Sequence, residues 1–126
     1  MLSKDQCKKC GKIYTDTTYK WCKPCQTNIL KKNFANWTSG IERIDNGIQK
    51  FQLNINHPWN IVFEWIPFDQ LKIITKIRKD IDQEVCSAIW KDGPLKYDEN
   101  KMEYIREPNN NVFVVLTTKS KFADEV

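Results

Sequence analysis

Two short motifs, CKKC at residues 7–10 and CKPC at residues 22–25, decide how the chain begins to fold. Two residues between the cysteines of a motif allow a tight turn to direct both sulfur atoms toward one metal ion, and two such pairs complete a tetrahedron. The spacing therefore predicts a zinc site whose ligands are Cys7, Cys10, Cys22 and Cys25. Because protein thiolates would fill all four positions, we expect this site to be structural and not catalytic.

Other uses of paired cysteines stay open. A redox dithiol needs only one such motif and is expected in a βαβ context, which this sequence lacks. Four thiolates would also hold an iron–sulfur cluster. Structural disulfides require an oxidising compartment, and residues 1–12 contain no apolar stretch typical of a secretory signal. We therefore expect zinc in an intracellular protein, cytoplasmic or nuclear.

Positive charge is concentrated near the N-terminus. Residues 1–36 hold eight lysines and two aspartates, whereas the rest of the chain has a formal charge of −2. Such asymmetry is typical of nucleic-acid contacts, and Tyr14, Tyr19 and Trp21 lie among these lysines, as on surfaces that stack bases. Two simpler explanations stay open: the lysines offset the negative charge of a tetrathiolate centre, and the aromatic rings form the core of a small domain.

An amphipathic helix is predicted after the cysteine motifs. The sequence SGIE at residues 39–42 matches a capping box, in which Ser39 and Glu42 bind backbone N–H groups at the start of a helix. Apolar residues then follow at helical spacing, and this stripe consists of Ile41, Ile44, Ile48 and Phe51. We expect a helical linker over residues 31–56.

The second half of the chain predicts an antiparallel sheet. Runs rich in β-forming residues occupy residues 71–77, 84–90 and 112–116, and a hairpin is indicated between residues 96 and 106. No apolar run approaches the roughly 20 residues that span a bilayer, so we expect no membrane contact. The predicted fold is α+β: a zinc ribbon over residues 1–30, the helical linker, and a β region over residues 57–126.

Four sequence blocks carry a family resemblance: CKPC at residues 22–25, NWTSG at 36–40, FEWIPF at 63–68 and SAIWKDGPL at 87–95. In this order they resemble the expanded protein-kinase-like family of arbuscular mycorrhizal fungi. Members of that family have a Cys-rich leader, a helical linker and a kinase domain. The resemblance implies that residues 57–126 correspond to part of a kinase N-lobe.

The sequence departs from that family where a kinase binds ATP. A kinase closes a Gly-rich loop over the phosphates and pairs two of them with a strand lysine. In the implied alignment, Arg78, Asp80 and Gln83 stand at the glycine positions, Val115 stands at the lysine position, and Glu125 corresponds to the glutamate that pairs with that lysine. The sequence contains neither an HRD nor a DFG motif. We therefore expect no catalysis and no binding of ATP or Mg²⁺.

Several functions stay open. The first is a non-catalytic, zinc-stabilised, pseudokinase-like module that binds a protein partner, such as a full-length kinase paralogue. The second is a member of a serine/threonine or tyrosine kinase family that binds ATP. The third is a nucleic-acid-binding zinc ribbon, and a truncated gene copy without function is the plainest account. A lobe cut short would leave an unpaired edge and an uncovered sheet face, which the helix stripe or a partner would cover.

Overall fold

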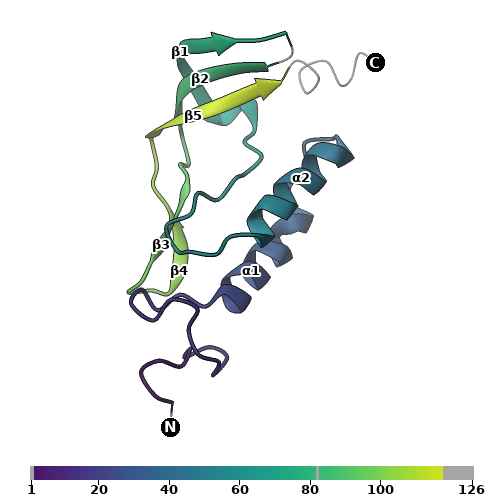
Figure 1. The fold of residues 1–126 in the computed structure, drawn as a ribbon. Helices are drawn as coiled ribbons and strands as arrows, with labels where there is room; N and C mark the ends of the chain where they lie inside the picture. Colours follow the sequence, from purple (N-terminus) through teal and green to yellow (C-terminus); the bar gives the residue numbers. More distant parts are fainter. Residues whose placement is uncertain (1, 82, 118–126) are drawn as a thin grey trace.

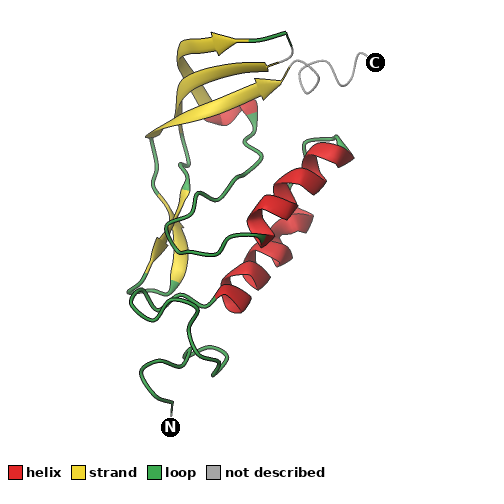
Figure 2. Cartoon of the chain, viewed as in Figure 1, coloured by secondary structure: helices red, strands yellow, loops and turns green. Residues whose placement is uncertain are grey.

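Two helices lie beside antiparallel strands in the computed structural model, which describes residues 2–81 and 83–117 (Figures 1 and 2). The predicted α+β class is confirmed. The helices and strands in chain order are α1 (Lys23–Lys32), α2 (Glu42–Leu53), β1 (Leu71–Lys79), β2 (Gln83–Trp90), β3 (Leu95–Asp98), β4 (Glu103–Arg106) and β5 (Asn110–Thr117). Two short 3₁₀ helices are η1 (Asn33–Asn36) and η2 (Phe68–Gln70).

An antiparallel ribbon runs along one side of the molecule (Figure 1). β2 pairs with β5 along its whole length, and the same two chain segments continue into the hairpin of β3 and β4. β1 pairs antiparallel with β2, which gives a three-stranded sheet of order β1-β2-β5. The ribbon therefore has a sheet end and a hairpin tip, and the tip lies beside the N-terminal segment.

Arg106 fixes the junction between the two halves of the ribbon. Its guanidinium donates to the two carboxylate oxygens of Glu64 at 2.7 and 3.2 Å and to the carbonyl oxygen of Gly93 at 2.8 Å. The same group lies 5.3 Å from the ring centre of Trp90, at the end of β2. Two-pronged bonds between arginine and a carboxylate set geometry as well as energy, so this contact ties the segment before the sheet to the ribbon.

The two helices pack against each other, α2 beside α1 (Figure 2). α1 begins with Cys22 as its N-cap and Pro24 in its first turn, a position that proline favours because its fixed φ suits a helix start. The helix therefore begins inside residues 1–30, earlier than the predicted linker, whereas α2 falls within that linker. In the described part of the chain, neither helix has the length and apolarity needed to cross a bilayer.

The start of α2 corrects the predicted capping box. Ile41 is the N-cap, and its side chain caps no backbone group. Ser39 instead binds Asp45, because its hydroxyl and its backbone N–H both donate to the same carboxylate oxygen, at 2.6 and 2.8 Å. The Ser39 hydroxyl also accepts the backbone N–H of Ile41 at 3.1 Å, but the predicted capping box with Glu42 is wrong.

The buried apolar cluster of the sheet consists of Cys86, Ala88 and Val114. Among the described residues, the side chains packed against this cluster come from the strands themselves and from Ile66, in the segment before the sheet. The expectation that the α2 stripe covers the sheet is therefore wrong. Its last member, Phe51, is 60% exposed and contacts the ring of Phe63, with ring centres 5.0 Å apart.

Gly93 and Gly47 offer a matched test of the ribbon junction. A Cβ at Gly93, which has φ +80°, would lie 1.6 Å from the carbonyl oxygen of Glu107, so Gly93→Ala should destabilise the chain by roughly 3 kcal/mol or more. Gly47 lies in α2 with open space around it, so Gly47→Ala should stabilise by about 0.4–1 kcal/mol. Urea midpoints measure both changes, and a tolerated Gly93→Ala would contradict the junction described here.

Candidate metal centre

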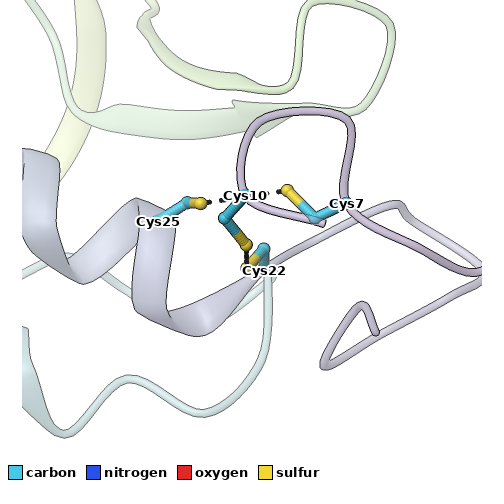
Figure 3. A group of neighbouring side chains, drawn as sticks. All are labelled: Cys7, Cys10, Cys22 and Cys25. Atoms are coloured by element: carbon cyan, nitrogen blue, oxygen red, sulfur yellow. Dashed lines mark hydrogen bonds between the residues drawn. The ribbon is translucent and has the colours of Figure 1, made fainter. Parts of the chain in front are cut away.

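The four predicted ligands converge at the N-terminal end of the molecule (Figure 3). Their sulfur atoms all lie within 4.8 Å of one another, with Cys7 3.8 Å from Cys25 and Cys10 3.7 Å from Cys22. A tetrahedron with Zn–S bonds of about 2.3 Å has sulfur separations of roughly 3.8 Å, whereas a disulfide requires about 2.05 Å. The cysteine cluster is therefore positioned to hold one metal ion.

Cys7 and Cys10 lie on a tight turn. The backbone N–H of Cys7 donates to the carbonyl of Lys12 at 2.6 Å, and that of Gly11 donates to the carbonyl of Cys7 at 2.7 Å. Gly11 has φ +78°, a conformation that only glycine adopts without cost. The N–H of Lys9 points at the Cys7 sulfur from 3.4 Å. The turn therefore directs a backbone N–H donor at one of the four sulfur atoms.

Cys22 and Cys25 lie at the start of α1, which differs from the second turn expected of a zinc ribbon. Cys22 is the N-cap and Cys25 lies in the first turn. The free N–H groups at a helix N-terminus carry partial positive charge and favour nearby anions. Asp16 and Trp21 exchange two backbone hydrogen bonds at 3.0 and 2.9 Å, and this turn leads the chain into Cys22. Pro24 was the available signal for a helix start here.

The four thiols differ in environment. Cys7 and Cys22 are buried, Cys25 is half-buried and Cys10 is exposed. A hydrogen bond from the Lys12 backbone lowers the pKa of Cys10 to about 7. Burial raises the pKa of Cys22 and that of Cys25, because a thiolate loses hydration there. A metal ion must therefore displace protons from these two thiols when it binds.

The cysteine cluster is tied to the tip of the β3–β4 hairpin through Met102. The Met102 carbonyl, at a residue with φ +56°, accepts hydrogen bonds from Gln26 Nε2 at 2.9 Å and from Lys9 Nζ at 3.1 Å. Tyr14 donates to the Met102 sulfur at 3.6 Å. Gln26 is only 2% exposed and directly follows Cys25. Sequence reasoning missed both Gln26 and Met102, because their contact joins segments far apart in the chain.

A second set of contacts surrounds Trp21, the residue before Cys22. Trp21 is fully buried, and its indole N–H donates to the Tyr104 hydroxyl on β4 at 3.1 Å. It shares a cluster with residues from α1, from the segment after α2 and from the β3–β4 hairpin. The segment that carries the four cysteines and the hairpin therefore share one apolar core.

Four of the residues at the implied kinase positions, Arg78, Asp80, Gln83 and Val115, lie at the sheet end, away from the cysteine cluster (Figure 1). Arg78 pairs with Asp80 at 2.9 Å, and the N–H of Asp80 donates to the carbonyl of Gln83 at 2.7 Å, which closes the connection between β1 and β2. Val115 lies on β5 and is 58% exposed. Glu125 lies outside the described residues.

Comparisons with protein-family models, with curated proteins and with solved structures found no match for the chain. The resemblance to the kinase-like family therefore stays a prediction from the sequence. The same holds for the division of the chain at residues 30 and 56.

Metal affinity should fall as the pH falls. Cys22 and Cys25 have raised pKa values, so each keeps its proton at neutral pH and must release it to bind metal. Acid therefore favours the protonated, metal-free form, and we expect affinity to drop by at least about tenfold per unit between pH 8 and 6. Competition with a chromogenic chelator measures this.

Cys86→Ala is the matched control for that titration, because Cys86 is a buried thiol in the sheet and not a member of the cluster. It should show the same affinity and the same pH dependence as the unaltered chain. An affinity independent of pH would argue against thiolate ligands.

Proposed function

We propose that the chain is a non-catalytic protein-interaction module organised by a structural metal ion, with zinc preferred. The observation that carries this proposal is the close spacing of the four sulfur atoms, which is compatible with a tetrahedron of thiolates around one ion. Four protein ligands complete the coordination of zinc, so no position is kept for substrate or water. Thiolate ligands favour zinc over Mg²⁺ or Ca²⁺.

The proposed metal unit combines one tight turn with one helix start, which is a variation on the predicted zinc ribbon. Apparent binding energies of structural zinc in small peptides are roughly 10–16 kcal/mol, as large as the whole stability of an ordinary domain. The cluster bonds to Met102 through Gln26. Metal binding would therefore stabilise the hairpin tip as well as the N-terminal segment.

The sheet end of the molecule supports the interaction part of the proposal. Phe113 is 77% exposed and Val115 is 58% exposed, and both project from the face of β5 opposite the buried Val114. In register, they lie beside Ser87 and Val85 of β2. Large apolar side chains that gather on one face are typical of contact sites.

The two edges of the sheet differ in how well they are protected against pairing with another strand. β1 has two register shifts and four basic residues, devices by which natural sheets block edge pairing. β5 has no charged residue and pairs with β2 without a shift. Within the described residues, no strand pairs with its other side. We propose that a partner strand adds along β5, supplied by a full-length kinase paralogue or by a second copy of this chain.

Self-association of the chain can be used to test strand addition at the β5 edge. Sedimentation velocity should show association of the metal-loaded chain as its concentration rises. Val115→Lys should suppress it, because a charge on an edge strand opposes pairing. Ile74→Lys is the matched control, since Ile74 is 52% exposed and lies on the protected strand β1. A chain that stays monomeric, or equal effects of the two substitutions, would count against strand addition.

The non-catalytic part of the proposal rests on the β1–β2 connection. Arg78 and Asp80 pair with each other there, where a kinase presents backbone N–H groups to phosphate. Val115 offers no charge at the position where a kinase binds two phosphates with lysine. A saturable thermal shift with Mg-ATP would overturn this part.

A further inference from the structure

Three aromatic rings gather on the surface beside the metal-binding segment. Trp59 is 63% exposed, Tyr19 is 43% exposed, and His57 is also exposed. The Trp59 and His57 rings stack, with centres 4.7 Å apart and planes 7° from parallel. Tyr19 meets Trp59 edge-on, with ring centres 5.9 Å apart. We call these three residues the aromatic platform.

The aromatic platform is not part of the apolar core. Among the aromatic residues near the N-terminal lysines, Tyr14 is 4% exposed and Trp21 is fully buried, as the core explanation predicts. Tyr19 departs from that explanation. It contacts the ring of Trp59 instead, and these rings keep apolar surface exposed to water.

The backbone around the platform is held in place from both sides. Lys20, directly after Tyr19, has φ +53°, and its carbonyl accepts the Tyr97 hydroxyl at 2.6 Å. On the other side, Asn60 accepts the backbone N–H of His57 at 3.0 Å. These bonds present the rings on an ordered surface, which lowers the entropy cost of binding a flat ligand.

The charge around the platform is positive. Lys20 adjoins Tyr19, and Lys23 Nζ binds Asn56, the residue before His57, at 2.6 Å. The segment of residues 54–60 contains no acidic residue. The acidic residue nearest to Tyr19 in sequence, Asp16, lies three residues before it and accepts the Tyr19 N–H at 3.0 Å. Residues 1–36 stay positive, at about +4, even after a metal ion with four thiolates is counted.

We propose that the aromatic platform binds single-stranded nucleic acid, with a base stacked on the exposed face of the Trp59–His57 pair and phosphates near Lys20 and Lys23. Every base has a flat face, so this binding tolerates different sequences. Cationic ligands also bind aromatic rings, but the two lysines repel them. The inference rests on the proposed metal centre, because Tyr19 and Lys20 lie between the two ligand pairs.

The test is fluorescence anisotropy of labelled oligouridine and oligothymidine with the full, metal-loaded chain at low salt. The chain should bind both, more tightly than duplex DNA, and the affinity should fall as salt rises. Trp59→Ala should weaken binding by about tenfold, and Trp59→Phe should restore most of it, because phenylalanine keeps a stacking face. Phe68→Ala is the control, since Phe68 is also 63% exposed and lies in η2.

Metal content and circular dichroism are measured for every variant. Lys23→Gln, which leaves the rings intact, should weaken binding and flatten its salt dependence. No binding by the metal-loaded chain, or equal affinities of Trp59→Ala and Phe68→Ala, would overturn the platform and leave the metal centre standing. Binding and fold that both survive chelation would instead overturn the metal centre and leave the platform standing.

Discussion

The main physical constraint on this molecule is the close approach of four thiol groups, whose sulfur atoms all lie within 4.8 Å of one another. Four thiolates at that separation repel strongly, and two of them, Cys7 and Cys22, are buried, where charge is costly. A bound cation removes this conflict, because it converts mutual repulsion into four attractive bonds. The N-terminal segment has few apolar side chains of its own, and a segment of that size requires such a cross-link to hold a fixed shape.

The consequences of that constraint extend along the ribbon. Gln26 follows the last ligand and holds the Met102 carbonyl at the hairpin tip, while Trp21 precedes the third ligand and packs under Tyr104. At the other end of the hairpin, Arg106 joins the ribbon to Glu64. Each contact links segments that are distant in sequence, and the first two join the hairpin to residues next to the four cysteines.

The parts of this fold that local patterns determine are predictable from the sequence. The ligands follow from the spacing of two CxxC motifs, and β1, β2 and β5 follow from runs of β-forming residues bounded by turns. α1 was missed because its buried positions, Gln26 and Leu30, form no apolar stripe. The predicted pairing of Ser39 with Glu42 was wrong because Ile41 is the N-cap, and the N–H and hydroxyl of Ser39 both donate to Asp45. Contacts such as that of Gln26 with Met102 leave no local trace in a sequence.

The central claim is that one metal ion holds the four cysteines and, through them, the fold. Native mass spectrometry with and without a strong chelator tests it most directly, with Cys25→Ser and Cys86→Ser as the paired variants and near-ultraviolet circular dichroism as the structural readout. The account predicts one metal ion per chain, its loss together with the signal of buried Trp21 on chelation, no metal in Cys25→Ser, and one in Cys86→Ser. The claim would be contradicted by a chain that carries no metal ion and whose circular dichroism spectrum does not change when the chelator is added.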